Sequence, residues 1–375
     1  MNWEIIEHRV NDSADLTEAE AKWLLEQAEL SDLKRLYALA DQVNQRLNGR
    51  VVSFIHNMNV NYTNICEYHC TFCEFKKSAD SEEAYILRFE DVERRIEEAD
   101  GTISEITFQG GLSPAVKFQD VLDLLRRIHA AYPDIHLHAF SPEEIDYYAE
   151  ETRQTYLEIV SQCKNAGMGS MCGTAAEVLD DGVRQKICWE KISSDEWCEI
   201  IKTAHRLGMH STATILFGHL EKPEHVANHF KRVRSLQRET HGITEFIPLL
   251  FMPDKTKLGR AIDHQVNRIE YAFKMIATAR LYFMNDIRNI QTSWVKLGWE
   301  NALQSLFLGA NDMSGTLYHE NITREAGGTN GEYTPREKFI SEITRIGKIP
   351  MERDTIYSFQ ADENLIWKCE MGSVN

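Results

Sequence analysis

The amino-acid sequence predicts an α/β protein built on a (β/α) TIM-type barrel, with N-terminal helices and a C-terminal closing segment. From residue 51 onward, apolar runs of strand length alternate with amphipathic stretches of helical length, which is typical of parallel βαβ units. Glycine-containing turns follow several of these runs, at Gly110, Gly173 and Gly218. Barrel enzymes build their active sites at such strand ends, so we expect the functional residues to gather on one face.

The elements of the barrel follow from the alternation of these patterns. Strands are expected at residues 51–59, 103–108, 135–140, 168–172, 210–217, 244–249 and 289–294. Helices are expected between them at residues 89–98, 118–131, 142–166, 194–207, 223–240 and 267–285. Units that repeat at roughly 30–40 residues favour a barrel over a small open sheet, but periodicity does not separate a closed barrel from a partial one.

Helical patterns also flank the barrel. Residues 17–47 predict two amphipathic helices that pack against the main domain, with Asp32 at a position suited to a cap. Glycine-rich turns and a helical stretch at 335–346 predict a segment that closes the barrel mouth. The expected organisation is a helical segment 1–50, a barrel 51–298 and a C-terminal segment 299–375.

Charge and hydropathy exclude several classes of function. The chain has a formal net charge of -17 and no prominent run of Lys and Arg, so it is a poor candidate for nucleic-acid or anionic-membrane binding. Its N-terminus is too charged for a secretory signal, and no stretch approaches the ~18 apolar residues of a membrane span. We therefore expect a cytoplasmic protein with small-molecule substrates.

Three of the eight cysteines lie in one short loop after the first predicted strand. Cys66, Cys70 and Cys73 have the spacing C-x3-C-x2-C. Thiolates are the usual ligands of iron–sulfur clusters, and a cubane cluster normally takes four. Three ligands leave one iron open to a chelating small molecule. The sequence therefore predicts a [4Fe-4S] cluster on this loop, and the scattered cysteines are expected to be buried.

Two other interpretations of the loop stay open. A zinc ion could bind the three thiolates together with His69 or a distant histidine. Because His69 adjoins Cys70 and adjacent residues seldom point at one metal, a distant fourth ligand is the better form of this alternative. The three cysteines could also be ordinary core residues that hold no metal.

The loop resembles the signature of the radical S-adenosylmethionine (SAM) superfamily, in which an aromatic residue precedes the last cysteine. Phe72 occupies that position, and the resemblance implies that it packs near the adenine of SAM. Gly110 and Gly111 look like the family's glycine pair, whose backbone meets the methionine amino group. Leu112 stands where the family usually has an acid. The resemblance implies a full or partial (β/α) barrel in which the cluster and SAM yield a 5′-deoxyadenosyl radical.

Longer segments resemble one subgroup of this superfamily over residues 51–328. The subgroup contains the tyrosine-using subunit of deazaflavin (FO) synthase, aminofutalosine synthase and dehypoxanthine futalosine cyclase. The stretches 173–177 and 309–317 resemble the first of these most closely. Cys172 departs from the pattern, since proline is expected there, and residues 56–58 also differ from the usual type.

The closest resemblance implies a specific reaction. An adenosyl radical abstracts hydrogen from L-tyrosine, the Cα–Cβ bond breaks, and the 4-hydroxybenzyl group is transferred to 5-amino-6-(D-ribitylamino)uracil in coenzyme F420 biosynthesis. A partner radical SAM subunit that completes the deazaflavin and an electron donor such as flavodoxin or ferredoxin are also implied. The alternatives are a menaquinone-pathway enzyme of the same subgroup and a non-enzymatic iron–sulfur or zinc protein.

Further side chains are candidates for ligand contacts. The resemblance places Ser141 and Glu177 against SAM, although Ser141 could instead cap a helix and Glu177 could be a solvated surface acid. Arg184 could pair with the methionine carboxylate or be an exposed helical residue. His138 and His219 could bind polar substrate groups or relay a proton. A core position is favoured for His138 and a functional one for His219.

Overall fold

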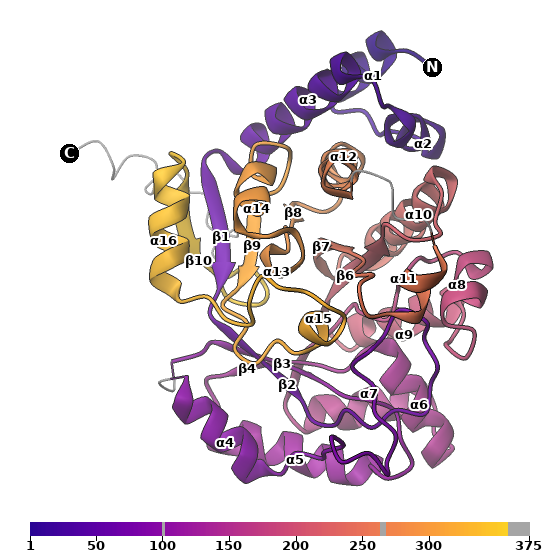
Figure 1. Cartoon of the computed structure of the whole chain (residues 1–375), viewed down its shortest axis with the longest axis vertical. Coiled ribbons are helices and arrows are strands. Elements are labelled where there is room, and N and C mark those ends of the chain that lie inside the picture. The colour runs from indigo at the N-terminus through magenta and orange to yellow at the C-terminus, as the bar shows by residue number, and fades with distance from the viewer. Residues whose placement is uncertain (100–101, 263–267, 359–375) are drawn as a thin grey trace.

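The computed structural model describes residues 1–99, 102–262 and 268–358, and its centre is a seven-stranded parallel sheet. The strands are β2 (Asn57–Asn61), β3 (Glu105–Gln109), β4 (His136–Ala139), β5 (Met168–Met171), β6 (His210–Phe217), β7 (Ile243–Leu250) and β8 (Asn289–Ile290). They pair in chain order, so each connection crosses outside the sheet. Figure 1 shows the curled sheet with the connecting helices around its outer side.

The outer helices match most of the predicted ranges. They are α4 (Phe89–Glu98), α5 (Phe118–Ala131), α6 (Pro142–Thr152), α7 (Tyr156–Asn165), α8 (Asp181–Ile187), α9 (Ser194–Arg206), α10 (Pro223–Thr240), α11 (Lys257–Ala261) and α12 (Arg268–Tyr282). The single helix predicted at 142–166 is wrong. Arg153 takes a left-handed conformation that ends α6, and a capping box between Thr155 and Glu158 starts α7.

A smaller parallel sheet joins distant parts of the chain in the order β10-β1-β9. It contains β1 (Val51–Ile55), β9 (Asp312–Gly315) and β10 (Ile349–Glu352). The strand predicted at 51–59 is interrupted at His56, so its halves β1 and β2 belong to different sheets. Single parallel bridges from Gln291 to Asp312 and from Met58 to Tyr318 attach the segment 312–318 to both edges of the large sheet. The predicted barrel is confirmed, as a curled sheet with this segment along its open edge.

Three helices precede the barrel: α1 (Trp3–Asn11), α2 (Glu18–Glu26) and α3 (Leu30–Asn48). The prediction missed α1. Helix α2 packs on α10 and α12, and α3 packs on α12, as Figure 1 shows. Asp32 is not a cap, because α3 begins two residues earlier. Its carboxylate instead accepts a hydrogen bond of 2.6 Å from the indole of Trp3 and ties α1 to α3.

The C-terminal part adds α13 (Trp294–Leu297), α14 (Trp299–Ser305), α15 (Ile322–Glu325) and α16 (Arg336–Arg345). The strand predicted at 289–294 is shorter than expected. Its chain turns into α13 at Trp294, whose indole donates to the Gly315 carbonyl at 2.9 Å. None of the described helices is long and apolar enough to cross a membrane.

A buried ionic network lies among β1, β7, β9 and the chain after β10. The guanidinium of Arg353 lies 2.6 Å from the Asp312 carboxylate and 3.3 Å from the Glu245 carboxylate. The Tyr357 hydroxyl lies 2.8 Å from the Glu245 carboxylate and 2.9 Å from the Asp312 carboxylate, so its single proton is shared between hydrogen bonds to the two acids. Each buried charge therefore has an opposite charge or a hydrogen-bond donor, as burial in a low dielectric requires.

His229 is a fully buried histidine of α10 that holds the segment after β5. Its Nδ1 accepts a hydrogen bond of 3.0 Å from the Leu179 backbone, and its ring packs on Phe246. Burial lowers the pKa of His229 from 6.5 to about 3. Since the unfolded chain takes up this proton near pH 6.5 and the folded chain does not, His229 reduces stability as the pH falls toward 3.

We therefore expect the free energy of unfolding of the wild type to fall by about 3 kcal/mol more than that of His229→Asn between pH 7 and pH 4. Denaturant titrations at a series of pH values measure this difference. If the free energies of unfolding of the two proteins changed with pH in the same way, His229 would not be a neutral buried imidazole.

Candidate active site

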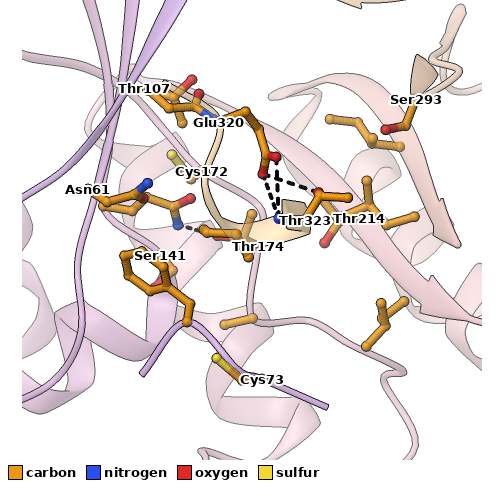
Figure 2. Close-up of a pocket in the computed structure, with 18 of the residues that line it drawn as sticks. Asn61, Cys73, Thr107, Ser141, Cys172, Thr174, Thr214, Ser293, Glu320 and Thr323 are labelled. Carbon is orange, nitrogen blue, oxygen red and sulfur yellow. Dashed lines mark hydrogen bonds between the residues drawn. The ribbon is translucent and has the colours of Figure 1, made fainter. Parts of the chain in front are cut away.

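A cavity of about 420 Å³ opens where the strands of the large sheet end, within the size range of small-molecule sites. Its walls come from the cysteine loop, the turns after β3, β4 and β5, the start of α13 and the segment around α15. Figure 2 shows polar side chains from these elements pointing into it. The predicted site residues on its wall are Cys66, Cys70, Phe72, Cys73, Gly110, Gly111, His138, Ser141 and Glu177.

The cysteine loop is hydrogen-bonded to three other connections. The Glu67 backbone N–H donates to the Leu112 carbonyl after β3 at 2.8 Å. The Thr71 N–H donates to the Ile187 carbonyl at the end of α8, and the Thr71 carbonyl accepts from Leu258 of α11, both at 2.8 Å. These hydrogen bonds to the turn after β3, to the end of α8 and to α11 fix the position of the cysteine loop.

The three thiols of this loop are free and half-buried in the cavity wall. Burial raises the pKa of Cys70 and Cys73, and the nearby ammonium of Lys191 acts in the opposite direction. A bound cation favours thiolates further. This donor set, three free thiols beside one cation, fits an iron–sulfur cluster with three protein ligands.

The structure gives no support to a zinc site that includes His69. The His69 imidazole lies 3.1 Å from the Glu190 carboxylate, and 58% of its side chain is exposed outside the cavity. Within the described ranges, no three His, Cys, Asp or Glu side chains gather closely enough to hold a single metal ion.

Gly110 and Gly111 are required by the packing of the protein itself. A Cβ on Gly111 would lie 2.2 Å from the Ile65 carbonyl oxygen, just before the first cysteine. A Cβ on Gly110 would lie 2.3 Å from the ring of Tyr62. Leu112, which replaces the expected acid, is buried. The glycine turn and the cysteine loop therefore pack too closely for any side chain between them.

Ser141 caps α6 and also lines the cavity. Its hydroxyl donates to the Glu144 carboxylate at 2.8 Å and accepts from the Glu144 backbone N–H. The same carboxylate accepts from the Tyr62 hydroxyl at 2.9 Å and from the Gly110 N–H at 3.0 Å. Glu144 thus connects α6, the residue that follows β2 and the glycine turn. The sequence predicted that Ser141 could cap a helix, and the structure shows that it does so while lining the cavity.

Glu177 pairs with a lysine that the sequence analysis did not single out. Its carboxylate lies 3.0 Å from the Lys191 ammonium, and both side chains are nearly buried, so Glu177 is not a solvated surface acid. The ammonium lies 5.7 Å from the centre of the Phe72 ring. Although burial alone would lower it, the charges of Glu177 and Cys70 raise the pKa of Lys191 well above its ordinary value. A fixed cation therefore stands beside the cysteine loop.

Two predicted site residues do not reach the cavity. The Arg184 guanidinium donates to the carbonyls of Ala176 and Ile192 at 2.6 Å, so it holds the loop that carries Glu177 instead of facing a ligand carboxylate. His219 has no exposed side-chain surface, and its Nε2 is 3.0 Å from the Leu216 carbonyl within its own turn. The expected functional position of His219 is therefore not what the structure shows.

His138 lies on the cavity wall within β4. Its Nδ1 is 2.7 Å from the Ser170 hydroxyl, and burial lowers the pKa of His138 to about 4. A neutral imidazole beside the buried Glu105 carboxylate makes this part of the wall polar.

Comparison with known proteins identifies the family. Residues 60–233 match the Radical SAM superfamily, and residues 240–366 match the CofH/MqnC C-terminal region. The chain is 42% identical over 330 residues to the 5-amino-6-(D-ribitylamino)uracil–L-tyrosine 4-hydroxyphenyl transferase of Methanothermobacter thermautotrophicus, covering 87% of this chain and 89% of the relative. The chain belongs to the CofH-type family of radical SAM enzymes. The protein of the same name from Archaeoglobus fulgidus is 40% identical, covering 86% of this chain and 92% of the relative.

Solved structures confirm the radical SAM fold of this CofH-type chain. Methylornithine synthase (PylB) superposes with a TM-score of 0.73 at 17% identity, covering 96% of this chain and 99% of the neighbour. The [FeFe]-hydrogenase maturase HydG superposes with a TM-score of 0.75 at 14% identity, covering 98% and 80%. At such identities the likeness concerns the fold alone.

The departure at Cys172 is accommodated within the CofH-type barrel. Its side chain is buried at the end of β5, and its thiol lies 3.2 Å from the His138 carbonyl. The thiol therefore fills space between β4 and β5 at the edge of the cavity, where it also forms part of the lining.

Proposed function

We propose that this chain transfers the 4-hydroxybenzyl group of L-tyrosine to 5-amino-6-(D-ribitylamino)uracil, a step in deazaflavin (FO) biosynthesis. The observation that carries the proposal is the loop of three free thiols on the wall of a substrate-sized cavity. The substrates are inferred from relatives of that name, which match about nine tenths of this chain.

Cys66, Cys70 and Cys73 would hold a [4Fe-4S] cluster with one iron left for SAM. When bound, the cluster and SAM supply a 5′-deoxyadenosyl radical. The glycine turn would present its backbone to the SAM methionine, and Phe72 would pack against the adenine. Glu177 would accept hydrogen bonds from the ribose hydroxyls, and Lys191 would offset negative charge beside the cluster.

Polar groups deeper in the cavity suit the ribityl chain and the uracil ring. The Asn57 amide donates to the Glu105 carboxylate at 3.1 Å, and the Thr107 hydroxyl donates to it at 3.2 Å. Thr212, Thr214 and Gln291 add further donors and acceptors to the lining. A polyol and a pyrimidinedione need many such groups, since each buried hydroxyl or amide requires a partner.

The segment around α15 covers the other side of the cavity. Glu320 and Thr323 face the interior in Figure 2, and Ile322 and Ala326 of the same segment add apolar lining. Such a cover would exclude water from a radical, which protects reactive species from side reactions.

The proposal also implies partners. An electron donor such as flavodoxin or ferredoxin would reduce the cluster, and a partner radical SAM subunit would complete the deazaflavin. A reducing compartment such as the cytoplasm suits the free cysteines.

The test is an anaerobic assay of the protein reconstituted with iron and sulfide. With SAM, a reductant, L-tyrosine and the ribitylaminouracil, we expect 5′-deoxyadenosine and a coupled product of the two substrates by mass spectrometry. L-Phenylalanine in place of L-tyrosine is the control for the 4-hydroxybenzyl group. Turnover of an enolpyruvyl benzoate or a futalosine derivative instead would favour a menaquinone-pathway enzyme. Zinc uptake without 5′-deoxyadenosine would indicate a non-enzymatic protein.

A further inference from the structure

Four cationic side chains line the cavity, and three of them have partners in the protein. Lys76 donates to a backbone carbonyl at 2.8 Å, Lys191 lies 3.0 Å from a glutamate oxygen, and Arg353 lies 2.6 Å from an aspartate oxygen. Lys296 is the fourth. In the part of the chain that the structure describes, its ammonium makes no hydrogen bond or ion pair. Among the described lining residues, Lys296 is therefore the cation for which the protein supplies no direct partner.

Lys296 reaches the cavity from α13, directly after β8. Its side chain is half-buried, and burial lowers its pKa, while the charge of Glu320 raises it. A desolvated ammonium without a partner is unfavourable, and an anion placed beside it relieves that cost. The position of Lys296 therefore suits a ligand carboxylate.

Glu320 supplies the matching negative charge. Among the charged neighbours of Lys296, Glu320 acts on it most strongly, and Lys296 is the cation that most strongly offsets the burial of Glu320. The two side chains nevertheless form no direct ion pair within 4.0 Å in the described residues. Glu320 is held in place by the backbone N–H and hydroxyl of Thr323, at 3.0 and 3.1 Å (Figure 2). A carboxylate has about four acceptor sites, so it can accept further donors.

We propose that the Lys296–Glu320 pair binds the head group of the amino-acid substrate, with Lys296 at the α-carboxylate and Glu320 at the α-ammonium. This inference rests on the proposed function, which brings L-tyrosine into the cavity. Figure 2 shows Glu320 on the side of the cavity away from Cys73. The charge of Glu177 also acts on Lys296, though less than that of Glu320, so Lys296 lies between the head-group position and the cofactor region. Lys191, not Lys296, is the cation that acts on Cys70.

The test removes the carboxylate or the ammonium from the ligand, and the charge of Lys296 or of Glu320 from the protein. Tyramine lacks the carboxylate of tyrosine, and 3-(4-hydroxyphenyl)propanoate lacks the ammonium. Equilibrium dialysis with the reconstituted holoenzyme and SAM, without reductant, gives the Kd of each compound. We expect Lys296→Met to weaken L-tyrosine binding about 10- to 100-fold and to leave tyramine binding unchanged. Lys296→Arg should restore most of the loss.

For Glu320→Gln we expect the complementary pattern of binding to the two tyrosine analogues. The substitution should weaken tyramine binding and leave binding of the propanoate unchanged. In steady-state assays, the KM for L-tyrosine of Lys296→Met should rise more than its kcat falls.

Two outcomes would overturn the inference while leaving the proposed function intact. Equal weakening of tyrosine and tyramine by Lys296→Met would mean that Lys296 only shapes the cavity. A raised Kd for SAM, with tyrosine binding unchanged, would assign Lys296 to the cofactor. If the wild type neither binds nor consumes L-tyrosine, the proposed function itself is wrong.

Discussion

Cys73→Ala is expected to remove the iron–sulfur cluster and with it the formation of 5′-deoxyadenosine. With one of the three thiols missing, only two protein ligands would remain for a cubane cluster. We expect 5′-deoxyadenosine formation to fall by at least ~10³-fold, because the cofactor and not the protein carries this chemistry. Iron and sulfide content per chain, the cluster absorbance and 5′-deoxyadenosine yield measure the effect.

The matched control is Cys198→Ala on α9. Cys198 is a free, half-buried thiol like Cys73, but it does not line the cavity. This variant should keep full iron content and activity. If Cys73→Ala also kept both, the assignment of the cluster to the cysteine loop would be wrong.

Gly111→Ala is expected to displace the cysteine loop. The new Cβ would lie 2.2 Å from the Ile65 carbonyl oxygen and 3.0 Å from the Cβ of Cys66. The first contact is with backbone, so no side-chain rotation relieves it, and the loop itself has to move. We expect a loss of about 3 kcal/mol in the free energy of unfolding. Iron content should fall as well, because the first cysteine is displaced.

Gly182→Ala is the control for an added methyl group at a glycine. Gly182 lies inside α8, and a Cβ there would meet only one side-chain oxygen, at 3.3 Å. Alanine also favours a helix over glycine by about 1 kcal/mol. Thermal unfolding and iron analysis of both variants give the comparison. Normal stability and iron content in Gly111→Ala would show that the two turns are not packed as described.

The sequence predicted the barrel because its signals are local. Apolar runs and helical periodicity lie within single elements, and α4, α5 and α10 begin and end where the pattern indicated. The break between α6 and α7 was also local, since Thr155 and Glu158 have the spacing of a capping box. The spacing of Thr155 and Glu158 therefore marks the start of α7 in the sequence itself.

Other features depend on contacts between distant residues. His56 interrupts the first strand because its imidazole is 3.1 Å from the hydroxyls of both Thr102 and Thr316, the latter 260 residues away. No periodicity contains such information. The same holds for the site: the cysteine spacing predicts the metal ligands, but Lys191 and Lys296 became candidates only when folding placed them in the cavity wall.

The Thr71 backbone N–H donates to Ile187 and the Thr71 carbonyl accepts from Leu258, and these two bonds bear on how the loop behaves without a cluster. They join backbone groups and do not involve the thiols, so they can form without bound iron. If the loop holds a cluster as proposed, loss of that cluster should therefore leave a folded chain with the three thiols still on the cavity wall. Because little of the loop would then have to be ordered again, we expect the metal-free chain to take up iron and sulfide without refolding.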